Sequence, residues 1–97
     1  MAIRVVVELL ALPGKRSELV NLMSGLVAAE GAAQPGFLGS TRYEVIDNPD
    51  LLVEIADWES AEARAAHMRR AAEAGLYAPV VELLATPFTA LEIRELM

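Results

Sequence analysis

The stretch FLGSTRYEVIDNPDLLVEIADW, residues 37–58, decides the fold that this sequence predicts. Residues 37–46 and residues 51–58 are rich in β-branched and aromatic side chains, which favour strands. Between them, in residues 47–50, the Asn and Asp side chains can bond their own backbone and Pro49 presets φ. The stretch therefore predicts an antiparallel hairpin whose strands are joined by a short polar loop.

Outward from the hairpin toward the N-terminus, the sequence predicts a helix and another strand. Residues 15–33 carry apolar side chains at helical spacing, which indicates one stripe packed in the core: Leu19, Leu22, Met23, Leu26 and Val27. The sequence Gln34-Pro35-Gly36 ends this helix, and Pro13-Gly14 separates it from residues 3–12. Residues 3–12 form a short, Val-rich apolar run that is typical of a strand.

Outward toward the C-terminus, Ser60 is expected to cap a helix that runs to about residue 74, where Gly75 ends it. A short second helical segment is expected over residues 78–85, with Pro79 in its first turn, and residues 88–96 predict the last strand. The order of elements is β-α-β-β-α-β, the ferredoxin-like arrangement. The sequence thus predicts one α+β domain, residues 1–97, with a four-stranded antiparallel sheet.

Alternation along the predicted strands assigns side chains to the two faces of the sheet. One face of residues 3–12 is wholly apolar, and the other mixes charged with apolar groups, as the lining of a cavity would: Arg4, Val6, Glu8, Leu10 and Leu12. One face of residues 37–46 carries Phe37, Gly39, Thr41, Tyr43 and Val45. In residues 51–58, Glu54 and Asp57 point to opposite faces, so a catalytic acid–base pair is not expected from them.

Composition favours a protein partner over nucleic acid or a membrane. Hydrophobic residues make up 55% of the 97 residues, above the usual fraction of about 45–50% in globular domains. No apolar run approaches the ~18 residues of a membrane span. The net charge is −6 and the basic residues are scattered, which argues against nucleic acid. Because oligomers are usually symmetric, we expect a homodimer to cover the apolar surplus.

Residues that carry chemistry are few. The chain has no cysteine and one histidine, and it lacks the spacing of metal sites, phosphate loops and nucleophilic serines. No metal site is therefore expected. The N-terminus lacks the pattern of a signal peptide, so a cytoplasmic location is expected.

Short motifs spread over the chain resemble those of a known family. They are Pro13-Gly14-Lys15, Gln34-Pro35-Gly36-Phe37, Trp58-Glu59-Ser60, Ala66-His67 and Pro87-Phe88. Together they resemble the antibiotic biosynthesis monooxygenase family of the dimeric α+β barrel proteins. The resemblance implies that the sheets of two protomers face each other in a barrel, and that each protomer keeps a pocket between its sheet and its helices.

The resemblance implies several activities, and the fold alone does not choose among them. Members oxidise polycyclic aromatic substrates with dioxygen and without added metal or flavin, and others oxidise quinols, degrade haem or isomerise small metabolites. Haem-degrading members carry Asn, Trp and His where this sequence has Val7, His67 and Tyr77, so haem degradation is not expected. The resemblance implies no cofactor.

His67 is the candidate catalytic residue, because many family members carry a histidine there that points toward the pocket. An imidazole can act as a base or bond a phenolic oxygen, whereas the alternative is a structural histidine that locks its helix. The candidate substrate-binding residues are Trp58, Tyr77, Tyr43 and Arg42. The alternatives are packing for the aromatic residues and an ion pair with Glu44 for Arg42.

Two functions stay open at this point. The first is a cofactor-independent monooxygenase-like enzyme that oxidises a small aromatic or quinone-type substrate, which predicts an enclosed apolar pocket with His67 at its wall. The second is a non-catalytic dimer that binds a small apolar or aromatic molecule or serves a neighbouring enzyme of a pathway. It predicts a pocket that is small or filled by apolar side chains.

Overall fold

The structure, a computed structural model, describes residues 2–30 and 34–96. The elements follow in the order β1 (Ile3–Leu10), α1 (Arg16–Glu30), β2 (Phe37–Val45), β3 (Asn48–Trp58), α2 (Ala61–Ala74), α3 (Ala78–Glu82) and β4 (Thr89–Ile93). This order confirms the predicted β-α-β-β-α-β fold, with α3 as the short second helical segment. The predicted end of the first helix, residues 31–33, lies outside the described residues.

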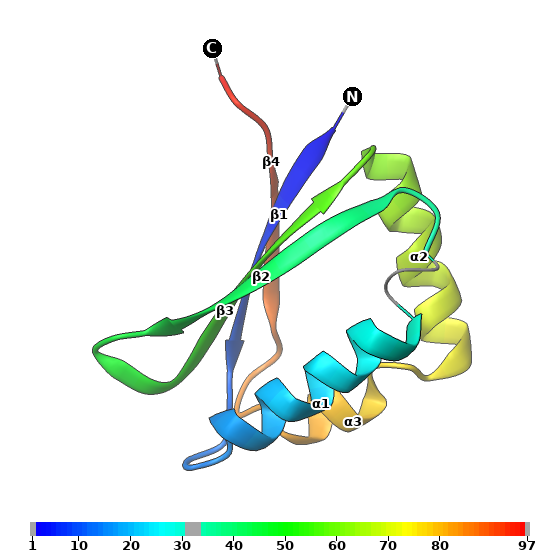
Figure 1. The fold of residues 1–97 in the computed structure, drawn as a ribbon. Coiled ribbons are helices and arrows are strands. Elements are labelled where there is room, and N and C mark those ends of the chain that lie inside the picture. The colour runs from blue at the N-terminus through cyan, green and yellow to red at the C-terminus, as the bar shows by residue number, and fades with distance from the viewer. Residues whose placement is uncertain (1, 31–33, 97) are drawn as a thin grey trace.

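The strands described form one antiparallel sheet in the order β2-β3-β1-β4, and the helices cover one of its faces (Figure 1). The wholly apolar face of β1 points to the helices, and its residues Val5 and Leu9 are buried. Leu9 packs with Leu19 of α1 and Leu52 of β3 in the larger core cluster. The mixed face of β1 therefore lies on the side without helices, and the expectation that it lines a cavity is wrong.

The hairpin between β2 and β3 turns earlier than predicted. Its strands pair as far as Val45 and Asn48, so the turn is at residues 46–47 and β3 includes Pro49 and Asp50. The polar residues still make the expected turn bonds, because the Asp50 amide donates to Oδ1 of Asn48 over 3.1 Å. The register of β2 and β3 shifts between Glu44 and Val45, next to this turn.

A second register shift, between Phe37 and Gly39, changes the face on which Phe37 lies. Phe37 pairs with Trp58 and packs against it on the helix side, whereas Tyr43 is 48% exposed on the opposite face. Simple alternation placed both side chains on one face. That prediction is wrong because the bulge inserts one residue into the strand and inverts the alternation before it.

The ends of α2 form as predicted. The Ser60 side chain accepts a hydrogen bond from the Ala63 amide over 3.1 Å, and Gly75 ends the helix in the left-handed conformation with φ of 64°.

The segment after α3 bonds to the end of β1, with Ala85 donating to Leu10 over 2.8 Å, so α3 ends before residue 85. The last strand is shorter than predicted, at Thr89–Ile93. Within the described residues, none of the helices has the length and apolar character required to cross a membrane.

Candidate active site

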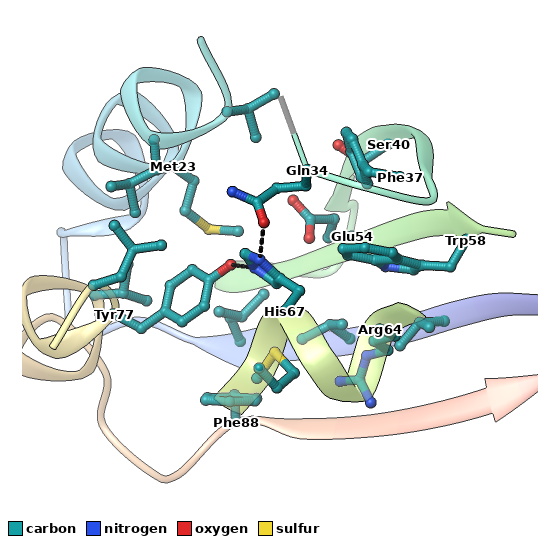
Figure 2. A pocket seen from close by; sticks show the side chains of 18 residues that line it. Met23, Gln34, Phe37, Ser40, Glu54, Trp58, Arg64, His67, Tyr77 and Phe88 are labelled. Carbon is teal, nitrogen blue, oxygen red and sulfur yellow. Dashed lines mark hydrogen bonds between the residues drawn. The ribbon is translucent and has the colours of Figure 1, made fainter. Parts of the chain in front are cut away.

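A cavity of about 130 Å³ lies between the helix-covered face of the sheet and the helices (Figure 2). Its walls are mainly aliphatic and aromatic, with Val5, Val7 and Leu9 of β1 as part of the sheet side. Polar or ionisable side chains also line it, and they are Gln34, Ser40, Glu54, Arg64, His67 and Tyr77. An apolar cavity with a few convergent polar groups is the usual form of a small-molecule site.

His67 of α2 lies at the centre of a hydrogen-bonded row in the pocket wall. Its Nδ1 is 2.8 Å from Oε1 of Gln34, and its Nε2 is 2.7 Å from the Tyr77 hydroxyl (Figure 2). Arg70 also donates to Oε1 of Gln34, over 3.3 Å. Arginine can only donate, so the Gln34 atom that Arg70 contacts is the amide oxygen. This oxygen is an acceptor, and it is the atom that faces Nδ1 of His67. In the neutral ring Nδ1 therefore carries the proton, and Nε2 accepts the hydroxyl proton of Tyr77.

The turn before β2 places Gln34 beside this histidine. Gly36 has a φ of 84°, and a Cβ at this position would lie 2.6 Å from Cβ of Ala63 in α2. The Glu59 amide also donates to the carbonyl of Gly36 over 2.7 Å. Only glycine suits both the backbone conformation and this close approach, so the turn is held against the first turn of α2.

Three aromatic contacts continue the wall on either side of His67. Trp58 meets Phe37 edge to face at a centroid distance of 5.2 Å, and its ring lies 5.3 Å from that of His67. The rings of His67 and Tyr77 are 5.9 Å apart in an edge-to-face arrangement. The centroid distances and the ring angles of these contacts suit favourable aromatic packing. The rings therefore form a defined surface against which a flat ligand can stack.

Glu54 of β3 is a carboxyl group inside a mainly apolar pocket, with 15% of its side chain exposed. Arg42 of β2 donates to its Oε2 over 3.2 Å and also to the Ser24 hydroxyl of α1 over 3.0 Å. Burial raises the pKa of Glu54 above its usual value, and the positive charge of Arg42 opposes the shift. Burial also raises the pKa of the Tyr77 hydroxyl, the charge of Glu54 adds to it, and Arg64 opposes it.

The structure brings together three of the five residues proposed from the sequence: His67, Trp58 and Tyr77 all line the pocket. Arg42 lies behind the wall, where it contacts Glu54 rather than the expected Glu44, which pairs with Arg16 over 3.4 Å. Tyr43 is not brought to the pocket, because it is on the other face of the sheet.

Gln34, Glu54 and Arg64 also line the pocket, although none of them was predicted from the sequence as a site residue. One signal could have identified Glu54. In the predicted strand of residues 51–58, every second residue points to the helices, and Glu54 is the charged member of that set of Leu52, Glu54, Ala56 and Trp58. Gln34 belongs to the motif of residues 34–37, but that motif predicted a turn, and the position of Gln34 beside His67 depends on the turn at Gly36.

The sequence profile of the antibiotic biosynthesis monooxygenase family matches residues 2–73. The chain belongs to this family. The comparison with curated protein sequences finds no match. The fold nevertheless recurs in solved structures of other proteins.

Three of those structures illustrate the likeness. A monooxygenase from the ActVA-Orf6 gene of Streptomyces coelicolor, solved with the ligand nanaomycin D, is 26% identical, with 97% of this chain and 87% of that chain covered and a TM-score of 0.82. A conserved protein from Methanosarcina mazei is 24% identical, with 98% and 93% covered and a TM-score of 0.83. Rv0793 from Mycobacterium tuberculosis is 24% identical, with 100% and 97% covered and a TM-score of 0.81. All three share the fold of this chain over nearly its whole length.

Proposed function

We propose that this member of the antibiotic biosynthesis monooxygenase family is a cofactor-independent monooxygenase-like enzyme that oxidises a small aromatic substrate of the phenol or quinol type. The observation that carries the proposal is the 2.7 Å hydrogen bond between Tyr77 and Nε2 of His67 at the wall of an apolar cavity. A proton acceptor is thereby placed beside a site that is shaped for a flat apolar molecule. The S. coelicolor protein, which is 26% identical and is described as a monooxygenase, supports this type of reaction.

The volume of the cavity restricts the size of the substrate. At about 130 Å³ it is close to the roughly 150 Å³ of an engineered apolar cavity that binds benzene. The cavity therefore suits one aromatic ring with small substituents. Such a ring is expected to pack against Trp58, whose side chain is the largest in the wall.

The row of polar groups supports one proton path. A hydroquinone that donates one of its two hydroxyl groups to the Tyr77 oxygen lets Tyr77 pass its own proton to Nε2 of His67, and the Gln34 oxygen then accepts from the positively charged imidazole. The resulting phenolate is the electron-rich form that reacts with dioxygen. In the balanced reaction, one oxygen atom enters the ring to give a quinone, and the other is reduced to water by the substrate's own electrons.

Dioxygen uptake with a panel of single-ring phenols and hydroquinones tests this proposal. We expect saturable uptake above the rate of autoxidation, and isotopically labelled dioxygen should place one labelled atom in the product. The non-catalytic alternative is favoured by the extent to which the polar groups in the wall bond one another. It predicts that the same phenols raise the Tm while dioxygen uptake stays at the autoxidation rate, and that outcome would refute the enzymatic proposal.

The open face of the sheet supports a homodimer. Val6 of β1 pairs with Ile55 of β3 on one side and with Leu91 of β4 on the other, so these side chains form an apolar row across the sheet. Leu91 is 61% exposed, and no described element covers this row. We infer that a second copy of the chain packs against it, because a homodimer would remove this apolar surface from water. The cytoplasmic location stays a prediction from the sequence.

A further inference from the structure

One oxygen of the Glu54 carboxyl is held by the protein and the other is not. Oε2 accepts from Arg42 over 3.2 Å, and no described group donates to Oε1. In the described residues, every side-chain nitrogen or oxygen atom that is sealed from solvent has a hydrogen-bond partner. Oε1 is therefore not sealed, and since Glu54 lines the cavity, this oxygen is available to a ligand there.

Arg42, which contacts both Glu54 and helix α1, restricts the orientation of this carboxyl. Arg42 reaches Glu54 with one guanidinium nitrogen and Ser24 of α1 with the other, at 3.2 and 3.0 Å. Arg42 is 21% exposed and Glu54 is 15% exposed, so the pair is mostly withdrawn from solvent. Figure 2 shows the Glu54 carboxyl directed into the pocket, on the side of Gln34 and His67. A ligand thus meets a fixed acceptor rather than a mobile surface carboxylate.

The geometry points to Glu54 as a specificity-determining residue, whose free oxygen accepts a hydrogen bond from a hydroxyl on a single-ring ligand and so selects phenols and hydroquinones over quinones and aryl ethers of similar shape. This inference rests on the proposed function only in taking the cavity as the ligand site. Its physical basis is that a ligand without a donor leaves the buried carboxyl oxygen without the hydrogen bond that water supplied. An acceptor such as a quinone carbonyl would face the carboxyl with repulsion.

Replacement of Glu54 by Gln offers a sharp test, because Arg42 can only donate. The amide oxygen of Gln is expected to face Arg42, which directs the amide NH2 group into the cavity. Glu54→Gln therefore converts the acceptor at this position into a donor without changing the size of the side chain. The preference for donor-bearing ligands should be lost or reversed.

Calorimetric titration without dioxygen measures this preference. The probes are para-cresol, which has a donor, para-fluorotoluene, which has a similar shape without one, and para-methylanisole, which has an acceptor only. For the wild-type protein we expect para-cresol to bind at least about tenfold more tightly than the other two. For Glu54→Gln we expect para-cresol to lose that advantage and para-methylanisole to bind more tightly than it does to the wild type.

Two further variants keep the test decisive. Glu44→Gln makes the same chemical change at a carboxyl that pairs with Arg16 and is 73% exposed, and it should leave the preference unchanged. Glu54→Met replaces the carboxyl with an apolar chain of similar length that suits the pocket. If Glu54→Gln does not fold, this variant tests whether the ligand preference depends on the carboxyl. It should bind para-cresol and para-fluorotoluene about equally.

Three outcomes overturn the inference: no preference for para-cresol in the wild type, a preference that survives both Glu54 variants, or an equal loss in Glu44→Gln. Dioxygen uptake is measured separately, so the two proposals fail separately. Loss of the preference in the Glu54 variants with no uptake by the wild type upholds the role of Glu54 and refutes the enzyme. Dioxygen uptake by the wild type together with an unaltered ligand preference in the Glu54 variants supports the enzyme and refutes the role of Glu54.

Discussion

Tyr77 lies beyond the helix break at Gly75, yet its hydroxyl is 2.7 Å from Nε2 of His67 inside the preceding helix. The left-handed turn at Gly75 reverses the chain and returns Tyr77 to the wall of the pocket. His67 is 5% exposed and bonded at both ring nitrogens. The structural and the functional interpretation of this histidine are therefore compatible, because its bonds fix the ring in the wall of the cavity.

The hydroxyl of Tyr77 can be removed with little change in packing. In the proton path proposed here, Tyr77→Phe should lower kcat/KM for dioxygen uptake by about 10²-fold or more, as for loss of other acid–base groups. The ring of Phe keeps the edge-to-face contact with His67, so the free energy of unfolding should fall by only about 1–3 kcal/mol, the cost of one unsatisfied buried acceptor. Uptake assays and urea denaturation check the two effects; full activity in Tyr77→Phe would contradict the path.

The contact between Gly36 and α2 predicts a difference between two glycine substitutions. Gly36 and Gly14 both have positive φ, at 84° and 77°, but a Cβ meets Ala63 at 2.6 Å only at Gly36. We expect Gly14→Ala to lower the free energy of unfolding by about 1 kcal/mol and Gly36→Ala by about 2–4 kcal/mol. Gly36→Ala should also reduce turnover, since it displaces Gln34 from His67. Equal destabilisation of the two variants by urea denaturation would contradict this account.

The raised pKa of Glu54 predicts a pH dependence of stability. In the window between the unfolded and the folded pKa, the unfolded chain has lost the proton that the folded protein keeps, so stability falls as pH rises. The contribution of Glu54 is fully present below the unfolded pKa of about 4.3 and is lost through the higher folded pKa. The free energy of unfolding of the wild type, minus that of Glu54→Gln, should therefore decrease from acid toward neutral pH. A difference that is constant with pH would rule out the shift.

The apolar row across the open sheet face predicts how a dimer dissociates. Ile55→Glu places a charge in the row, between Val6 and Thr41, and it should raise the dimer dissociation constant by about 100-fold or more, because an unpaired charge would be buried. The control is Val81→Glu on α3, which is 52% exposed and lies away from the sheet face. Light scattering coupled to size-exclusion chromatography reports the mass. A wild-type monomer, or dissociation caused equally by both substitutions, argues against this interface.

The order of elements could be predicted from the sequence because local signals separate each helix or strand from the next. Ser60 and Gly75 cap α2 through bonds to backbone groups only a few residues away, and such bonds do not require the rest of the fold. The apolar face of residues 3–12 was also assigned correctly, since alternation holds wherever a strand has no bulge. The bulge beside Phe37 and the register shift beside Val45 were not predicted, because register depends on the partner strand.

The sequence by itself determined the family, the element order and the presence of Trp58, His67 and Tyr77 as candidate pocket residues. Only the tertiary structure decided that Gln34 and Glu54 join them and that Tyr43 does not. Gln34 and His67 are 33 residues apart and meet through the contact of Gly36 with Ala63, and Glu54 is held by an arginine on the neighbouring strand. Capping and periodicity act within a few residues, whereas a binding site depends on the packing of distant segments, and that packing is set only when the sheet, its bulge and the helices come together.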